Sequence, residues 1–170
     1  MVATASYDAT RARGETYFDR TATQTWERLT SDAPVSRVRQ TVRAGRDRMR
    51  ALMLSRLPDD LSGVRVLDAG CGAGQMTAAL AARGADVTAV DISPALIEVA
   101  RARLPSDTPG RVRFVAGDML GDLGEHDFVV AMDSLIYYSV PDIAAALDRL
   151  AERVRGGVVF TVAPRTPFLM

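Results

Sequence analysis

The chain has 170 residues and no formal net charge; 48% of its residues are hydrophobic and 25% are charged. This length suits one globular domain with a sizeable core, and the zero net charge excludes a global electrostatic attraction to nucleic acid. The single cysteine, Cys71, excludes an internal disulfide, and no apolar run approaches the roughly 20 residues that a membrane-spanning helix needs. We therefore expect a cytoplasmic protein with no transmembrane segment and no nucleic-acid partner.

Residues 1–60 are predicted to form an N-terminal helical cap. Residues 1–13 are small and polar, and we expect them to be frayed or disordered. Aromatic and apolar anchors within residues 15–30 favour a helix that docks on a surface. Apolar residues at three- and four-residue steps then predict a helix over residues 35–57, which Pro58 ends.

Residues 61–170 alternate between short apolar runs and helical patterns. Such a pattern requires right-handed crossovers and a parallel sheet that is covered on both faces. We predict an α/β fold with a Rossmann-like, doubly wound, mostly parallel sheet. The expected strands are 64–68, 86–90, 111–115, 127–132 and 157–162, and the expected helices are 74–83, 94–104 and 141–154.

The stretch LDAGCGAGQ follows the first predicted strand, where open α/β sheets bind their ligands. Its spaced glycines are Gly70, Gly72 and Gly74. Glycines let the backbone turn sharply and approach a ligand closely, although a tight strand-to-helix turn would need them too. Asp68 would repel a pyrophosphate and suit the ammonium group of an amino acid. Gln75 stands where a dinucleotide-binding motif has glycine or alanine.

Carboxylates also follow the next two predicted strands. Asp91 is placed to accept hydrogen bonds from ribose hydroxyls, or else to cap the next helix, for which Ser93 is the better candidate. Asp118 could accept from the exocyclic amine of an adenine that stacks on Met119, or could simply form a Gly-Asp turn. The stretch AMDSLIYY, residues 131–138, would face cofactor and substrate together.

Taken together, these stretches resemble the class I S-adenosylmethionine-dependent methyltransferases. The glycine motif LDxGCGxG matches Leu67 to Gly74, the acidic ribose ligand matches Asp91, and the Gly-Asp of the adenine site matches Gly117 and Asp118. The resemblance implies S-adenosyl-L-methionine as cofactor and S-adenosylhomocysteine as product. It implies cofactor binding by Asp68, Gly70, Cys71, Gly72, Gly74, Asp91, Ile92, Asp118, Met119 and Met132.

A narrower resemblance lies outside the glycine motif. YFDRTATQTWERLTSD and FVVAMDSLIYY look like the magnesium-protoporphyrin IX O-methyltransferases of bacteriochlorophyll synthesis. This resemblance implies methylation of a propionate carboxylate of the metalloporphyrin to its monomethyl ester. Contact with the porphyrin-delivering subunit of magnesium chelatase, and peripheral association with the photosynthetic membrane, are further expectations. Tyr17 and Tyr137 are the expected catalytic residues that position the substrate; the alternative for each is an ordinary packed aromatic.

Two other functions stay open at this point. One is a quinone-pathway or other small-molecule O-methyltransferase, which would want a base or metal near the phenol. The other is a non-catalytic S-adenosylmethionine-binding subunit. Residues 37–56 hold seven arginines and one acid, Asp47. They form either a solvated helix face or a surface for propionates, a partner enzyme or an anionic membrane.

Three further expectations concern single positions. Cys71 is read as a small buried filler, and His126 as a surface or strand-entry residue. The chain stops at Met170, soon after the fifth predicted strand. Class I methyltransferases add strands six and seven there, so we expect these strands to be missing and the sequence to cover part of a longer chain.

Overall fold

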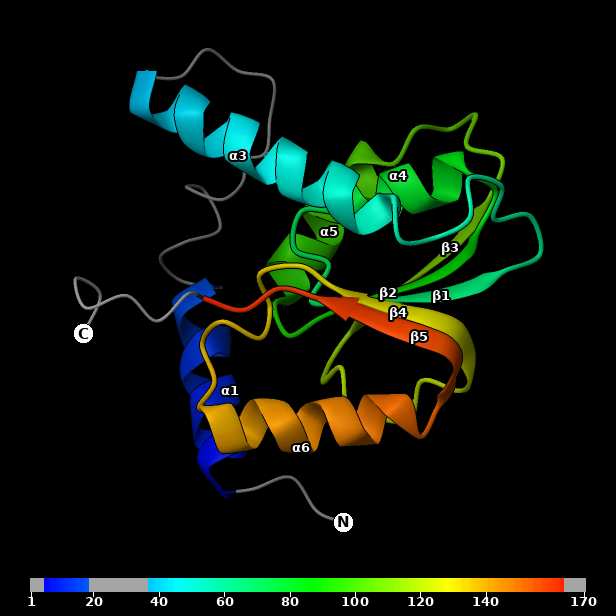
Figure 1. The fold of residues 1–170 in the computed structure, drawn as a ribbon. Coiled ribbons are helices and arrows are strands. Elements are labelled where there is room, and N and C mark those ends of the chain that lie inside the picture. Colours follow the sequence, from blue (N-terminus) through cyan, green and yellow to red (C-terminus); the bar gives the residue numbers. More distant parts are fainter. Residues whose placement is uncertain (1–4, 19–36, 164–170) are drawn as a thin grey trace.

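The computed structural model describes residues 5–18 and 37–163 (Figure 1). The helices are α1 (Ala5–Tyr17), α3 (Arg37–Leu54), α4 (Gln75–Ala82), α5 (Pro94–Arg103) and α6 (Val140–Ala151). The strands are β1 (Arg65–Ala69), β2 (Asp86–Asp91), β3 (Arg111–Ala116), β4 (His126–Ala131) and β5 (Val154–Phe160).

The strands form one parallel sheet in the order β3-β2-β1-β4-β5. The chain moves outward from β1 to β3 and then crosses back to β4, so the strand order reverses between β1 and β4. In an open α/β sheet this reversal leaves a crevice at the carboxyl ends of the strands. The predicted doubly wound α/β fold is confirmed.

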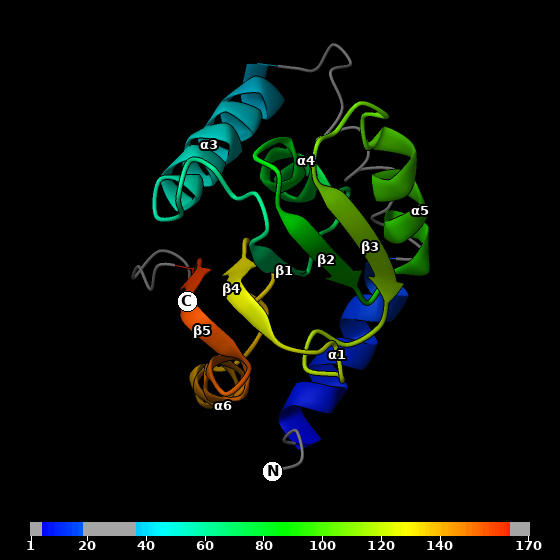
Figure 2. The ribbon, with the colours of Figure 1, turned by 90° about the vertical axis from the view of Figure 1, so that its right-hand side faces the viewer.

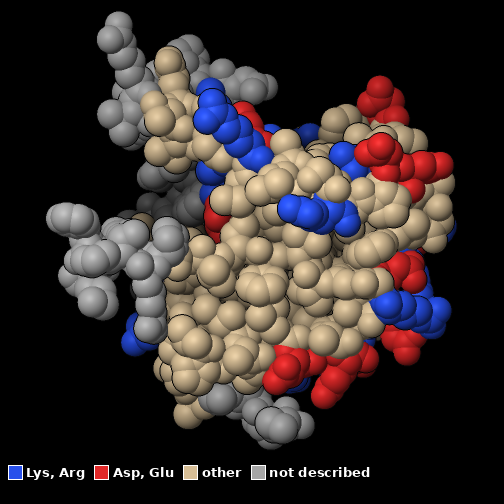
Figure 3. All heavy atoms as spheres, viewed as in Figure 1, with Lys and Arg blue, Asp and Glu red and all other residues tan. Residues whose placement is uncertain are grey.

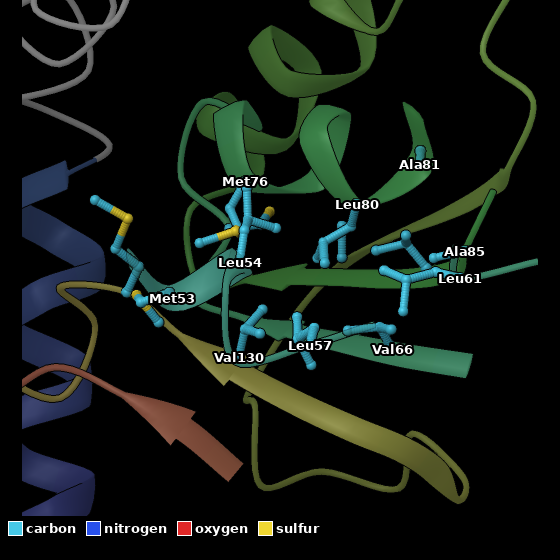
Figure 4. Packing of buried hydrophobic residues seen from close by; sticks show 14 of the residues in the cluster. Met53, Leu54, Leu57, Leu61, Val66, Met76, Leu80, Ala81, Ala85 and Val130 are labelled. Carbon is cyan, nitrogen blue, oxygen red and sulfur yellow. The ribbon is translucent and has the colours of Figure 1, made fainter. Parts of the chain in front are cut away.

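Helices cover the sheet on both faces. In Figures 1 and 2, α3, α4 and α5 lie on one side of the sheet, with α1 and α6 on the other. Met53 and Leu54 at the end of α3, and Leu57 after it, pack with Val66 of β1 and Leu80 of α4 in one core cluster (Figure 4). The predicted helix over residues 35–57 thus contributes directly to the core. The domain boundary at residue 60 stays a prediction.

The expectation that residues 1–13 are frayed or disordered is wrong for the part that the structure describes, because α1 begins at Ala5. Its anchor is Tyr7, which is 2% exposed. The Tyr7 ring stacks on Tyr138 at a centroid distance of 4.7 Å, and its hydroxyl donates to Asp118 at 2.9 Å. Ser6 donates to Asp142 of α6 at 2.8 Å. These partners lie more than a hundred residues away, so local composition does not indicate the helix.

The other N-terminal predictions fall partly outside the described residues. Of the expected helix over residues 15–30, the structure describes only residues 15–18; Trp26 lies outside. The expected helix over residues 35–57 is confirmed as α3, Arg37–Leu54. Among the described helices, none is both long and apolar enough to cross a membrane.

Candidate active site

A cavity of about 700 Å³ lies at the carboxyl ends of the central strands. The loops after β1, β2 and β4 line it, and side chains of α1 and α3 add to its walls. It occupies the crevice that the sheet topology provides. Ten of the predicted site residues line it: Tyr17, Asp68, Gly70, Cys71, Gly72, Asp91, Ile92, Met119, Met132 and Tyr137. Gly74 and Asp118 are not among the described lining residues.

The glycine loop is shaped by backbone torsion and by close packing. Gly70, Gly72 and Gly74 all have positive φ, between 52° and 85°. A Cβ on Gly70 would lie 2.3 Å from the Cβ of Ser134 in the loop after β4, whereas Gly72 has nothing within 4 Å. A Cβ on Gly74 would lie 2.8 Å from the Cβ of Ala100 in α5. Gly74 therefore allows α5 to pack closely against the glycine loop. Gly70 allows the glycine loop to contact the loop after β4 beneath the cavity.

Asp91 organises this loop from the end of β2. Its Oδ2 accepts the Gly72 amide at 2.9 Å, and its Oδ1 accepts the Ser93 amide at 2.9 Å. The hydroxyl of Ser93 accepts the Leu96 amide at 3.2 Å and caps α5. Ser93 is thus the helix cap, as predicted. The Asp91 carboxylate instead ties the glycine loop to β2 at the cavity wall.

Asp68 lies beneath the loop and is 1% exposed. Thr77 of α4 donates to its Oδ2 at 2.6 Å. Burial raises the pKa of Asp68 to about 7 despite this hydrogen bond. The neighbouring Cys71 is also buried, and burial raises the pKa of its thiol well above the ordinary value. Cys71 is therefore an uncharged filler, as predicted, and Asp68 is a carboxyl group that a cationic ligand would stabilise in its ionised form.

Asp118 faces α1. Its Oδ1 accepts the Tyr7 hydroxyl and the Leu120 amide, both at 2.9 Å, and its Oδ2 lies 3.7 Å from Nε of Arg11. Its neighbours Gly117 and Met119 line the cavity. Recognition of adenine by Asp118 stays a prediction; the contacts of this carboxylate in the structure hold α1 in place.

Arg46 and Arg50 of α3 line the cavity, although nothing in the sequence distinguishes them from the other arginines of residues 37–56 as site residues. Arg46 forms an ion pair with Asp133 in the loop after β4. Arg50, one turn later, donates to Gln75 at 3.4 Å and pairs with Asp47 at 2.6 Å. The solvated-face interpretation of this helix is wrong for these two residues. Their i, i+4 spacing places both on one helix face.

Three aromatic side chains gather at the cavity near this ion pair. Tyr17 packs edge-on against Phe18 with ring centroids 5.3 Å apart, and Phe18 packs edge-on against Tyr137 at 5.7 Å. Tyr17 is 53% exposed and Tyr137 is 49% exposed, so neither is an ordinary buried aromatic. Burial, followed by the Asp133 carboxylate, raises the pKa of Tyr137, which keeps its phenol protonated. We call Tyr17, Phe18 and Tyr137 the aromatic wall.

His126 begins β4, at the end of the sheet away from the cavity. It is buried, so the predicted surface role is wrong and the strand-entry role holds. Burial lowers its pKa, which disfavours the charged form. Among the described residues, no group of three His, Cys, Asp or Glu side chains could hold a metal ion.

Comparison with known proteins decides the family. Residues 66–157 match the family model of the methyltransferase domain. Over 166 residues the chain is 62% identical to magnesium-protoporphyrin O-methyltransferase of Rhodobacter capsulatus, covering 96% of this chain and 74% of that protein. The chain belongs to the magnesium-protoporphyrin O-methyltransferase family. It is also 33% identical over 157 residues to the chloroplastic magnesium protoporphyrin IX methyltransferase of Arabidopsis thaliana, covering 88% of this chain and 50% of that protein.

Solved structures agree with this assignment. Magnesium protoporphyrin IX methyltransferase from Synechocystis PCC 6803, with bound S-adenosylhomocysteine, superimposes with a TM-score of 0.83 at 28% identity, covering 94% of this chain and 75% of that one. The same enzyme with bound S-adenosylmethionine gives a TM-score of 0.79 at 27% identity, covering 92% and 77%. This methyltransferase therefore uses S-adenosylmethionine as its cofactor.

The cavity fits that cofactor. The Asp91 carboxylate lies at the end of β2, where ribose hydroxyls are bound in such sheets. A nearby positive charge would favour the ionised form of the buried Asp68 at neutral pH, and the cofactor carries an ammonium group. Arg50, held by Gln75 at the start of α4, offers a cation for the cofactor carboxylate.

Proposed function

We propose that this methyltransferase transfers the methyl group of S-adenosylmethionine to a propionate carboxylate of magnesium protoporphyrin IX and so makes the monomethyl ester. The observation that carries the proposal is the juxtaposition, at one cavity, of the cofactor loop, the half-exposed aromatic wall and the Arg46–Asp133 pair. A porphyrin presents a flat apolar ring and ionised propionates, which match an aromatic surface with a cation beside it.

Each end of the cofactor has a candidate partner in the cavity. In the proposal, Asp91 accepts from the ribose, Asp68 binds the ammonium group, and Arg50 binds the carboxylate, while Met119 packs against the adenine. The cofactor supplies an electrophilic methyl group: an oxygen–carbon bond forms, the carbon–sulfur bond breaks, and the electron pair goes to sulfur. Gly70 and Gly72 keep side chains away from this space.

The chain needs no general base for this reaction. A carboxylic acid with a reference pKa of about 4 is already ionised at pH 7. The residues have to hold the acceptor oxygen in line and keep water away from it. Tyr17 and Tyr137 are suited to this, because a protonated phenol donates one hydrogen bond and its ring excludes water. Proton transfer by either residue is not required.

A quinone-pathway O-methyltransferase is the second candidate. The chain is 43% identical over 100 residues to ubiquinone biosynthesis O-methyltransferase of Xylella fastidiosa, covering 57% of this chain and 40% of that protein. A phenol has a pKa of about 10 and needs a base or a metal to react at neutral pH. The described cavity residues offer no histidine and no metal-ligand cluster, which favours a carboxylate acceptor.

The partners and the location of the protein are part of the same proposal. Because the ring of the porphyrin is apolar, the substrate would pass directly from the porphyrin-delivering subunit of magnesium chelatase, in the cytoplasm or at the periphery of the photosynthetic membrane. The arginine side chains that lie at the surface along α3 in Figure 3 support this part of the proposal. Such a helix can meet an anionic partner or lipid headgroups.

The test is to incubate the protein with isotopically labelled methyl donor and either magnesium protoporphyrin IX or a catechol precursor of a quinone. We expect label in an alkali-labile ester of the porphyrin. Labelling of the catechol alone would select the second candidate. If S-adenosylhomocysteine binds but neither acceptor is methylated, the protein is the non-catalytic cofactor-binding subunit.

A further inference from the structure

Arg46 is held at the cavity by contacts outside its own helix. Its guanidinium pairs with Asp133, which is 87 residues away in the chain. Asp133 has a left-handed backbone, with φ of 59°, and its amide donates to the hydroxyl of Thr161 at 2.7 Å. That hydroxyl also donates to the Asp133 carboxylate at 3.3 Å. The cation is therefore oriented by a loop that Thr161 holds in place.

The ion pair lies beside the aromatic wall. Asp133 is four residues before Tyr137 in the same loop, and both line the cavity with Arg46. The charges of Asp133 and Arg46 act in opposite directions on the pKa of Tyr137, which places both near the phenol. An acceptor whose ring packs on the aromatic wall would bring a carboxylate within reach of Arg46.

We propose that Arg46 binds the propionate of the porphyrin that is not methylated, and so positions its other propionate for reaction. This inference rests on the proposed function. A guanidinium bound to the reacting carboxylate would stabilise an anion whose charge disappears as the ester forms, which would slow the reaction. Bound to the second carboxylate, the same contact acts equally on substrate and transition state and contributes only binding and orientation.

This arrangement explains why only one of the two propionates would be esterified. For a second methyl transfer, the porphyrin would have to turn over and place its new ester against Arg46. A neutral ester cannot form the charge-assisted hydrogen bonds that hold a carboxylate there. Arg46 would then face an ester, which is a poorer partner for a guanidinium than a carboxylate, so the monoester is not a good substrate.

The assignment is tested by measuring how tightly the Arg46→Ala variant binds three porphyrins. These are the diacid, the monomethyl ester product and the dimethyl ester. Each is used as its magnesium complex, with S-adenosylhomocysteine present. We expect at least tenfold weaker binding of the diacid and of the monoester, which both carry the unmethylated propionate. Binding of the dimethyl ester should not change. In turnover, KM for the porphyrin should rise by a larger factor than kcat falls, and dimethyl ester should accumulate.

The control is Arg48→Ala, which removes an exposed arginine from the same helix away from the cavity; binding of all three porphyrins should be unchanged. Arg46→Lys should recover part of the affinity because it restores the charge. Weaker binding of the diacid alone would mean that Arg46 holds the reacting carboxylate and would overturn the proposal. So would equal weakening of all three porphyrins, no weakening, or weaker binding of S-adenosylhomocysteine. If the unsubstituted protein binds none of the porphyrins, the proposed function itself fails.

Discussion

At the scale of a single residue, the protonation state of Asp68 should affect both stability and cofactor binding. Burial raises its pKa to about 7, so in the ligand-free protein part of this group is protonated at neutral pH. Between about pH 4 and pH 7 the folded protein holds a proton there that the unfolded chain has released. The contribution of Asp68 to the free energy of unfolding therefore falls as pH rises through this range and is constant above it.

A ligand ammonium beside Asp68 favours the ionised carboxylate, so binding below pH 7 should release the proton. We predict that the affinity for S-adenosylhomocysteine rises from about pH 6 to about pH 7.5 and then levels off. Calorimetry in buffers of different ionisation enthalpy would count the released protons. The Asp68→Asn variant should bind more weakly and lose this pH dependence. An unaltered pH dependence in the variant would place the titrating group elsewhere.

Gly70 and Gly72 allow a matched comparison within one loop. Alanine at either position has to adopt a positive φ, which costs about 1–2 kcal/mol. Gly70→Ala also drives a Cβ into Ser134, and overpacking of this kind costs about 1–3 kcal/mol more. We expect a larger loss in the free energy of unfolding for Gly70→Ala than for Gly72→Ala, measured by urea denaturation. Equal losses would show that the loop after β4 shifts without cost.

At the scale of whole elements, α1 depends on one buried side chain. Tyr7→Phe keeps the ring stacked on Tyr138 but removes the hydrogen bond to Asp118. We expect the free energy of unfolding to fall by about 1.5 kcal/mol, as for a hydrogen bond to a charged group. Hydrogen exchange of the α1 amides should accelerate more than that of β1. Thr16→Ala, on the exposed side of α1, is the control. A uniform change across the protein would mean that α1 does not open separately.

The elements between β1 and β5 could be predicted from the sequence because each has its own periodic signal. The start of β5 is an exception: the structure begins it at Val154, before Gly156 and Gly157, which resemble a turn. A Cβ on Gly156 would lie 2.7 Å from the Asp127 carbonyl oxygen, so this glycine serves close strand packing. The helix α1 was missed for a related reason, since its stabilising contacts come from distant loops.

At the scale of the whole molecule, the site divides into a local part and a non-local part. Asp68, Gly70 and Asp91 could be found from the sequence because one strand–loop–helix–strand segment carries them at fixed spacing. The Arg46–Asp133 pair could not, because it joins a helix before the sheet to a loop after β4. A sequence pattern can place each partner on an element, but only the packing of α3 over the sheet brings them together.

Elements from both sides of the sheet line the cavity, so ligand binding should stabilise both N-terminal helices. Excess S-adenosylhomocysteine, at about 100 times its Kd, should raise the free energy of unfolding by about 2.7 kcal/mol. Because Gly14 and Tyr17 of α1 and Arg50 of α3 line the cavity, we predict slower hydrogen exchange in both helices as well as in the glycine loop. NAD, which lacks the amino-acid group that Asp68 suits, should give neither effect. Protection confined to the loops after β1 and β2 would show that α1 and α3 do not close on the cofactor, and that their lining residues serve the acceptor alone.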